Sequence, residues 1–560
     1  MFSTAVKLAN LDDYLESSQD CIVSLLSDKD DSKPRIAVMR PAKTEHKESG
    51  NKSENTEKAT VNLADCLACS GCVTSAETKL LQDQNVTRFM DQIKQKKMTV
   101  ISISNQSCSS FANQLNCDLN TIQRKFSGLF KHIGAKFVMN STISEYISLL
   151  ETKYEFISRY KKNSNLPMII SHCPGWVFYS EKSLDNSVIP LLSRVRSAQQ
   201  LQGILIKTLT LEIYNQLLFL YKFRLINPYR IRSIKYTFTK YDEFVDQKDI
   251  FHVAIMPCHD KKLESTRSSL SIKSLDENST FPEVDIVLAT SEVEELINLA
   301  GFNSLLDVPE APLDNLWLNQ SFQITSKNDL SLLITENNTN NQILNQFCWL
   351  IPSYYNSNSG GFCEYIIRSA IKELSGEDID KRIKLPFKKL INDTFEAEYK
   401  ENNVKLRYCL AYGFRAIQSI SRKLNLQKNA SQHIQSIGGM SNDVSYHLIE
   451  AMACPSGCIS GGGQILLKNN GKDDSSFEVE NIRKNIKFID GVQETFYKGI
   501  ELNSNRDIIL PNEIPIVNIL YDYLIKIDKQ IDTSFDPKLP FLRNDFVSIG
   551  EIPTASSLKW

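Results

Sequence analysis

The stretch FHVAIMPCHDKKLE, residues 251–264, contains a short apolar run that stops at Pro257 and Cys258 and then turns charged. Runs of the same kind recur along the chain, as MTVISIS (98–104), PMIISHCPGW (167–176), VDIVLAT (284–290) and YHLIEAMAC (446–454). A continuous apolar run of this length is typical of a strand buried on both faces. The chain therefore holds several candidate strands of one type.

A helical pattern follows most of these runs. In residues 290–301, TSEVEELINLAG, either Thr290 or Ser291 is the expected N-cap and Gly301 is the expected stop. Buried strands that alternate with helices predict an α/β fold with a largely parallel sheet.

Three cysteines, Cys173, Cys258 and Cys454, fall where apolar runs end. Binding sites in parallel α/β folds lie at the carboxyl ends of the strands. Taken alone, Cys173 or Cys258 is more often a buried core residue than a ligand. Counted together with Cys458, the strand-end cysteines make four thiolates, which is the complement of one cubane cluster.

Composition narrows the class of protein. The 560 residues are 42% hydrophobic and carry a formal net charge of −2, which argues against the basic stripe of a nucleic-acid-binding protein. We find no secretory signal and no apolar run of transmembrane length, so a cytosolic or nuclear location is expected. In a reducing compartment the 13 cysteines are expected to be metal ligands, reactive thiols or core residues rather than disulfides.

An N-terminal motif places Cys66, Cys69 and Cys72 at two-residue spacings. A ferredoxin-type run has a fourth cysteine four residues later, where this chain has Ala76, so the fourth ligand must come from elsewhere. Cys21 is the only other cysteine of this part, beyond a polar stretch, residues 28–60, expected to be a flexible loop. An iron–sulfur cubane fits this run best; zinc and free thiols are the alternatives.

A second motif, EAMACPSGCISGGGQ at 450–464, contains Cys454 and Cys458. Their spacing predicts two thiolates on one face of a helical turn, with Pro455 in its first turn. The three glycines that follow, 461–463, are expected to allow close approach to a bulky group. The alternative is a glycine-rich loop beside two core cysteines.

Three segments, SHCPGW, MPCHDKKLE and EAMACPSGCISGGGQ, together resemble the large-domain signatures of iron-only hydrogenases, in the same order. LADCLACSGCVTSAE, residues 63–77, resembles the N-terminal signature of the hydrogenase-like assembly factors of the cytosolic iron–sulfur protein machinery, the nuclear prelamin A recognition factor-like family. The resemblance implies a two-lobed large domain with parallel sheets flanked by helices, plus a small N-terminal iron–sulfur segment. It also implies two [4Fe–4S] clusters, the second deep between the lobes. The ligands would be Cys21, Cys66, Cys69 and Cys72 for the first cluster and Cys173, Cys258, Cys454 and Cys458 for the second.

The chain departs from catalytic hydrogenases at two positions. His172 stands where those enzymes keep a proton-shuttling thiol, and Ile465 replaces a proline. Lys261 and Glu264 do match the second signature, where the lysine supports the diiron unit, although a solvated helix start is the alternative. The remaining cysteines match no ligand position and are expected to be structural: Cys108, Cys117, Cys348, Cys363 and Cys409.

The resemblance implies a non-catalytic protein that links scaffold ATPases to a targeting complex containing a WD40 propeller. The alternatives are a true hydrogenase and an interaction protein of the nucleus. The C-terminal Leu558, Lys559 and Trp560 are expected to help dock a partner, although Lys559 breaks the usual pattern. The expected domains are residues 1–95 for the first cluster, 96–500 for the two-lobed body and 501–560 for a small-subunit-like segment.

Overall fold

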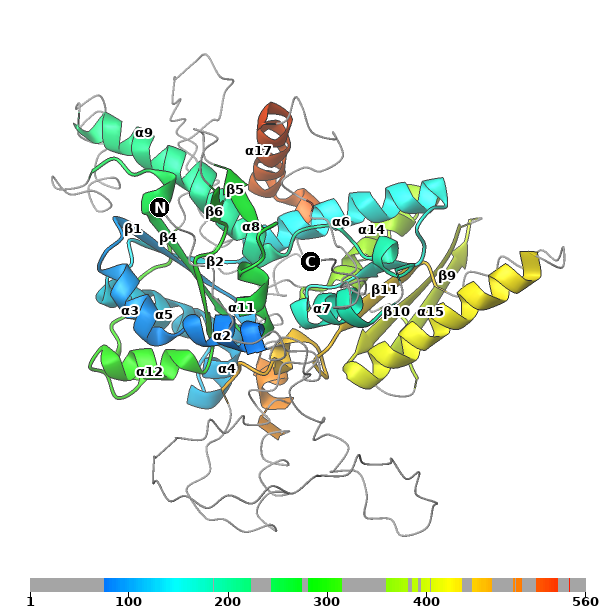
Figure 1. Ribbon diagram of the computed structural model, residues 1–560, viewed down its shortest axis with the longest axis horizontal. Helices are drawn as coiled ribbons and strands as arrows, with labels where there is room; N and C mark the ends of the chain where they lie inside the picture. The colour runs from blue at the N-terminus through cyan, green and yellow to red at the C-terminus, as the bar shows by residue number, and fades with distance from the viewer. Residues whose placement is uncertain are drawn as a thin grey trace, which may run out of the picture.

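The computed structural model describes residues 75–184, 186–222, 243–273, 280–314, 359–380, 385–390, 394–402, 404–435, 446–465, 487–488, 490–495, 510–531 and 543 (Figure 1). They form two α/β lobes, each around its own sheet, as predicted. Of the expected ligands, Cys21, Cys66, Cys69 and Cys72 lie outside the described residues, and so do Cys348 and the C-terminal Leu558, Lys559 and Trp560. No described helix is long and apolar enough to cross a bilayer.

The first lobe is built on a parallel sheet of four strands in the order β2-β1-β4-β7. These strands are β1 (Met98–Ile103), β2 (Phe137–Asn140), β4 (Ile250–Met256) and β7 (Ile286–Ala289). Every residue of β1, β4 and β7 is buried, which explains why their sequences are continuous apolar runs and not alternating ones. The helices of this lobe are α2 (Ser75–Asp83), α3 (Val86–Ile93), α4 (Asn105–Leu115), α5 (Leu119–Ile133) and α12 (Glu292–Leu299).

Helix α12 confirms the expected start and stop signals. Ser291 is its N-cap residue, although its side chain makes no capping hydrogen bond. Gly301 follows the C-cap with φ of +84°, a conformation that glycine adopts without strain.

The second lobe is built on a five-stranded sheet in the order β3-β11-β10-β9-β8. Its strands are β3 (Met168–Ile170), β8 (Lys388–Lys389), β9 (Thr394–Glu401), β10 (Val404–Tyr412) and β11 (Leu448–Met452). The first three strands in this order are parallel, and β9 and β8 extend the sheet antiparallel. Its helices are α6 (Thr142–Lys162), α7 (Pro174–Ser183), α14 (Phe362–Ser375) and α15 (Phe414–Gln435).

Shorter elements complete the described chain. The antiparallel pair β5 (Ser271–Lys273) and β6 (Thr280–Pro282) stands apart from both sheets. The remaining helices are α8 (Ala198–Leu205), a π-helical turn η4 (Ile206–Thr210), α9 (Leu211–Lys222), α11 (Asp260–Ser265) and α17 (Pro515–Ile531). Single 3₁₀ turns are η3 (Ile189–Leu191), η5 (Gln247–Asp249), η6 (Leu305–Asp307), η9 (Cys458–Ser460) and η10 (Pro511–Glu513).

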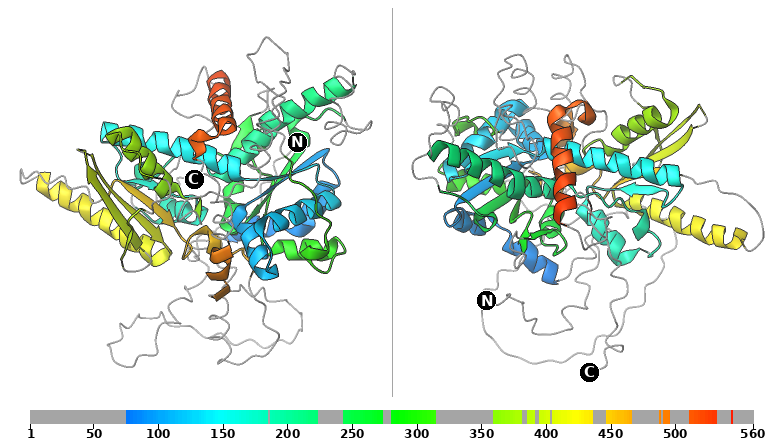
Figure 2. Two further views of the ribbon diagram at one scale, coloured as in Figure 1. Left: turned by 180° about the vertical axis from the view of Figure 1, so that it is seen from behind. Right: turned by 90° about the horizontal axis from the view of Figure 1, so that it is seen from above.

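Helices α6 and α8 pack together where the lobes meet (Figure 2). Gln202 of α8 bonds Ser144 of α6, and Nε2 of Gln202 donates to the carbonyl of Asn140 at 3.4 Å. A Cβ at Gly203 would overlap the carbonyl of Glu283, so only glycine lets α8 approach the first lobe this closely. Helix α17 also spans the junction, because Tyr521 contacts α6 and Tyr523 contacts α9.

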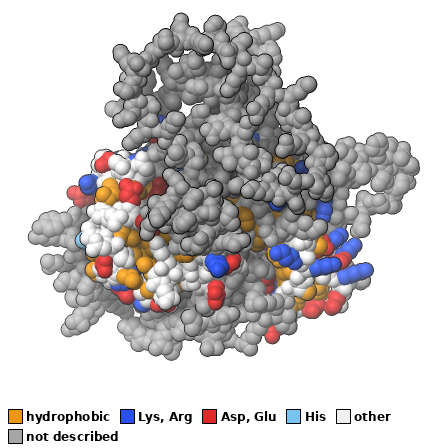
Figure 3. Space-filling view, turned by 90° about the horizontal axis from the view of Figure 1, so that it is seen from below, with side chains coloured by type: hydrophobic (Ala, Val, Ile, Leu, Met, Phe, Trp, Pro, Cys, Tyr) orange, Lys and Arg blue, Asp and Glu red, His pale blue; other side chains and the backbone are white. Residues whose placement is uncertain are grey.

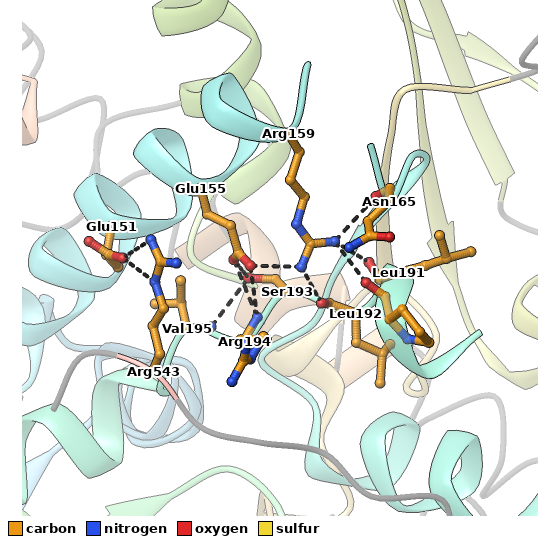
Figure 4. A network of polar contacts seen from close by, with 11 residues as sticks. Glu151, Glu155, Arg159, Asn165, Leu191, Leu192, Ser193, Arg194, Val195 and Arg543 are labelled. Carbon is orange, nitrogen blue, oxygen red and sulfur yellow. Dashed lines mark hydrogen bonds and ion pairs between the residues drawn. The ribbon is translucent and has the colours of Figure 1, made fainter. Parts of the chain in front are cut away.

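A buried network of charged groups lies along α6 (Figure 4). Glu155 accepts from Nη2 of Arg159 and from Oγ of Ser193, both at 2.7 Å. Glu151 accepts from the hydroxyl of Tyr521 at 2.6 Å and from Nε of Arg543 at 2.5 Å. In this network each carboxylate has a cation and a hydroxyl as partners. We call the six residues the α6 network: Glu151, Glu155, Arg159, Ser193, Tyr521 and Arg543.

The surface is mixed in charge. In the view from below, Lys, Arg, Asp and Glu side chains are interspersed over the described parts of that face (Figure 3).

Candidate metal centre

Cys173 lies directly after strand β3 and is the N-cap residue of α7, where Pro174 occupies the first turn. Proline suits that turn because its missing N–H would have no helical partner there. The hydroxyl of Ser171 donates to the carbonyl of Ala451 in β11 at 2.6 Å and accepts from the backbone N–H of Cys173 at 3.1 Å. This hydroxyl therefore ties Cys173 to the strand that leads to Cys454.

Cys454 and Cys458 do not lie on one helical turn, so that prediction is wrong. The carbonyl of Cys454 accepts from the backbone N–H of Gly457 at 3.1 Å, which closes a tight turn with Pro455 at its second position. Ser456 has φ of +58° and Gly457 has φ of +82°. Proline fits the second position of a turn as well as it fits a helix start, and the positive φ values prevent a helix from continuing.

Cys458 then opens η9, and its backbone N–H donates to Oγ of Ser359 at 2.9 Å. Ser359 directly precedes Gly360 and α14. The second lobe thus fixes the backbone of Cys458 from a segment far away in sequence.

The glycines after Cys458 allow close approach, as predicted, and the structure shows this approach for the backbone of Pro257 and Cys258. The N–H of Gly463 donates to the carbonyl of Pro257 at 2.9 Å. A Cβ at Gly461 would overlap that same carbonyl and lie 3.2 Å from Cβ of Cys258. This contact brings Cys258, at the end of β4 in the first lobe, to the cysteines of the second lobe.

The contacts of Ser171 with Ala451 and of Gly461 and Gly463 with Pro257 bring together the segments that carry the four thiols. Burial raises the pKa of Cys173 to about 12, with further increases from Asp260 and the thiolate of Cys458. Burial also raises the pKa of Cys258 and of Cys454 well above the usual range, and neighbouring thiolates add to both shifts. The pKa of Cys458 is raised by burial to about 11, although Lys261 opposes the shift. We call these four cysteines the four-thiol site.

The donor set decides which metal group the site fits. A single tetrahedral ion with bonds of about 2.3 Å holds its sulfurs in mutual contact. Among the described residues, no three His, Cys, Asp or Glu side chains are close enough to hold one ion. A cubane binds each thiolate through a different iron atom, so its ligands stand farther apart. Four thiols match the ligand number of one cubane, and the described side chains do not form a closed single-ion site.

A cavity of about 50 Å³ lies beside Cys458 and is lined by His172, Lys261, Glu145 and Phe362 among others. The ring centroids of His172 and Phe362 lie 3.9 Å apart. Burial and the nearby charge of Lys261 hold the pKa of His172 well below its ordinary value, so the imidazole is neutral at physiological pH.

Lys261 and Glu264 are not a solvated helix start, so that alternative is wrong. The Lys261 side chain is 10% exposed, and its Nζ lies 2.7 Å from Oε2 of Glu264. Burial alone would lower the pKa of Lys261, but Glu264 and the thiolates of Cys258 and Cys458 raise it. Lys261 is therefore a fixed positive charge beside the thiols.

Some residues of the site carried no signal in the sequence. Glu145 is 6% exposed, and burial raises its pKa to about 7. It lies in the first turn of α6, where an acidic residue is ordinarily explained by the helix dipole. Ser171 and Ser359 act through hydrogen bonds that only the folded chain reveals. Cys108, Cys363 and Cys409 pack in the cores, as expected of structural cysteines, and Cys117 is partly exposed.

The segment that leads from the N-terminal cysteines into the fold is anchored beside Cys258. Helix α2 begins shortly after Cys72 and contacts α11, which follows Cys258. Nε2 of Gln84 donates to the carbonyl of Lys262, and Nζ of Lys262 donates to the carbonyl of Gln84, both at 2.8 Å.

Comparison with known proteins places these observations in a family. Residues 97–216 and 232–462 match the family described as "Iron only hydrogenase large subunit, C-terminal domain". The chain is 33% identical over 486 residues to cytosolic iron-sulfur assembly component 3 of Mus musculus, covering 83% of this chain and 84% of the relative. It is 31% identical over 508 residues to the cytosolic Fe-S cluster assembly factor narfl of Xenopus tropicalis, covering 87% and 89%.

Among solved structures, the fold is similar to apo [FeFe]-hydrogenase HydA1 from Chlamydomonas reinhardtii. The TM-score is 0.54 at 17% sequence identity, and the match covers 84% of this chain and 98% of the other. A likeness at this identity concerns the fold.

Proposed function

This chain belongs to the iron-only hydrogenase large-subunit family, and from that premise we propose that it is a non-catalytic iron–sulfur protein that helps to mature cytosolic iron–sulfur proteins. The names of its relatives support the assembly role. The observation that carries the proposal is the four-thiol site, where thiols from both lobes converge.

Cys173, Cys258, Cys454 and Cys458 would hold one [4Fe–4S] cluster between the lobes. Without a cation, four buried thiols are costly to ionise because each thiolate raises the pKa of the others. The positive iron atoms of a cluster stabilise all four thiolates at once and thereby connect the two lobes. The fixed charge of Lys261 supports the same anionic group.

Cys21, Cys66, Cys69 and Cys72 would hold a second [4Fe–4S] cluster. The spacing of the last three supports a cubane. Helix α2 starts shortly after Cys72 and is anchored through Gln84 and Lys262. This anchoring supports a position for the N-terminal cluster near the four-thiol site.

His172 supports a role without hydrogen chemistry. By its resemblance it occupies the position of the proton-shuttling thiol, and burial together with Lys261 lowers its pKa, which disfavours the protonated ring. Catalysis of hydrogen evolution is the second candidate function, and the hydrogenase fold is the observation that favours it. Infrared bands of iron-bound carbonyl and cyanide in the purified protein would decide for the enzyme.

The proposed partners are scaffold ATPases of cluster assembly on one side and a WD40-containing targeting complex on the other. Leu558, Lys559 and Trp560 would contribute to docking, since an exposed terminal tryptophan is a common anchor in interfaces. The proposed location is the cytoplasm and also the nucleus.

The test is an iron and sulfide analysis of anaerobically purified protein. Two cubanes require about eight irons and eight sulfides per chain, because each cubane holds four of each. Cys454→Ala should lower the iron content by about half and abolish activation of cytosolic iron–sulfur enzymes in cells that lack the wild-type protein. The matched control is Cys409→Ala, which removes a buried thiol of the same lobe outside the site. If Cys454→Ala and Cys409→Ala behave alike, the proposal is wrong.

A further inference from the structure

A second cavity of about 30 Å³ lies beside Cys173, and Val177, Val195 and Leu270 line it as well as polar side chains; we call it the polar cavity after the latter. It is enclosed by the start of α7, the segment before α8, the first turn of α8 and the end of α11. The residues used below that line it are Ser197, Gln200, Arg196, Arg267 and Glu264. A volume of this size holds a water molecule or an ion of similar dimensions.

Two side chains that line the polar cavity are buried without partners. Gln200 is 1% exposed, and neither its Oε1 nor its Nε2 has a hydrogen-bond partner in the part of the chain that the structure describes. The hydroxyl of Ser197, which is 8% exposed, is in the same situation. Each unpaired buried group costs about 1–3 kcal/mol, so three such atoms at one small cavity indicate a missing ligand.

The cavity also receives the N-terminal end of α8. Ser197 is the N-cap residue of that helix, but its side chain does not bond the first-turn N–H groups. The N–H of Gln200 already donates to the carbonyl of Ser197 at 3.0 Å, so the helix contributes the partial positive charge of its N-terminal end.

The charged groups that line the cavity favour an anion. Arg196 and Arg267 face it, and their carboxylate partners, Glu283 and Glu181, are not among the lining residues. One carboxylate, Glu264, does line the cavity, but its Oε2 is bonded to Lys261. Side-chain donors therefore outnumber the one carboxylate in the lining of a space too small for an organic molecule.

We propose that the polar cavity binds a small inorganic monoanion of the size of a halide or hydrosulfide. The side chains of Gln200 and Ser197 donate to it, and the N-terminal end of α8, Arg196 and Arg267 supply the favourable potential. The proposal does not depend on the proposed function, because no residue that holds the anion is a cysteine of the four-thiol site.

The first test is crystallographic. Crystals of the full chain, grown anaerobically, are soaked in sodium bromide and measured at the bromine absorption edge. We expect an anomalous peak within hydrogen-bond distance of Gln200 and Ser197. A cavity that contains only water in these crystals overturns the proposal.

The second test uses matched variants in solution. Gln200→Glu keeps the shape of the side chain and adds a negative charge, so binding of bromide should weaken at least tenfold; Gln200→Leu removes the donor and should also weaken it. Gln114→Leu, a change at a distant glutamine that pairs with Glu294, is the control and should bind as the wild type does. Unchanged bromide affinity in both Gln200 variants contradicts the proposal, and thermal melting verifies that they fold.

Competition identifies the source of the anion. Displacement of bromide by sodium hydrosulfide supports the site and indicates sulfide as its ligand, whereas resistance to displacement supports a halide site. Iron content is measured on the same samples, so that loss of the clusters is not mistaken for loss of the anion.

Discussion

The α6 network and the four-thiol site are the two main buried polar regions at the lobe junction, and they are built in opposite ways. In the α6 network, Glu151 and Glu155 each have a cationic partner and a hydroxyl from the chain itself. In the four-thiol site, the groups that lie nearest to one another carry the same charge when ionised. In the first region every carboxylate has its own cation, whereas in the second Lys261 is one positive charge beside four thiols. This difference separates a structural network from a binding site.

The largest effect is expected from removing the metal. Metal binding to four thiolates contributes to folding itself, and apparent values for structural zinc reach about 10 kcal/mol. Iron-depleted protein should therefore melt at least about 10 °C below the holoprotein in calorimetry, since each kcal/mol shifts a domain of moderate size by about 2–4 °C. Equal melting temperatures of the iron-depleted protein and the holoprotein would show that the four-thiol site, like the α6 network, needs no metal for its stability.

Breaking the α6 network should have the next largest effect. Arg543→Ala leaves Glu151 buried without its cation, which costs about 3 kcal/mol by analogy with other buried pairs. Denaturant unfolding measures the loss. Lys372→Ala removes one partner of an exposed pair with Asp378 and should cost less than about 1 kcal/mol. Similar losses of unfolding free energy in Arg543→Ala and Lys372→Ala would mean that the buried network stabilises the fold no more than an exposed ion pair does.

The close approach of the lobes can be tested at Gly461. A Cβ there overlaps the carbonyl of Pro257, so Gly461→Ala must shift Cys258 away from Cys458. We expect a cost of about 2 kcal/mol and a loss of iron from the four-thiol site. Gly301→Ala is the control, because its Cβ meets nothing within 4 Å and only the positive φ is unfavourable. Full iron content in Gly461→Ala would contradict the role of this contact.

The smallest effect concerns Glu450, a buried carboxyl on β11 whose hydrogen-bond donors are both neutral. Its oxygens accept from the backbone N–H of Cys363 at 2.7 Å and from the hydroxyl of Tyr412 at 2.9 Å, yet burial raises its pKa to about 7. The folded state therefore holds a proton that the unfolded state releases above about pH 4.5, so stability falls as the pH rises from about 4.5 to 7.

Glu450→Gln should remove this dependence, and its stability relative to the wild type should rise by about 1–2 kcal/mol between pH 5 and pH 8. Denaturant unfolding across this range measures the difference. The exposed Glu398→Gln on β9 should follow the wild-type curve at every pH. A parallel curve for Glu450→Gln would mean that its carboxyl is ionised throughout.

Much of the fold was predictable because it depends on local pattern. The runs that became β1, β3, β4, β7 and β11 are mostly apolar and buried at every position, and a cysteine at the end of a parallel strand is placed by the topology of the sheet. The domain limits at residues 95 and 500 remain a prediction. So does the ligand role of each cysteine.

The details that failed depend on contacts between distant residues. Pro455 suits a helix start and a turn equally well, and only the positive φ of Ser456 separates them. An exposed Lys261 was the alternative to its match with the second signature because lysine is usually exposed, but Glu264 pairs with it in the interior. Glu151 and Arg543 are 392 positions apart, a separation at which no sequence pattern indicates a pair.

That separation has a consequence for the order in which the molecule is made. Ribosomes synthesise a chain from its N-terminus, so Glu151 emerges long before Arg543 exists. Until then, the junction between the lobes contains the carboxylate of Glu151 without its guanidinium partner. Tyr521 and Arg543, the two partners of this carboxylate, are both synthesised late. A nascent or prematurely terminated chain is therefore distinguishable from a finished one at a single position, and quality-control proteases that sample open states would remove the former preferentially.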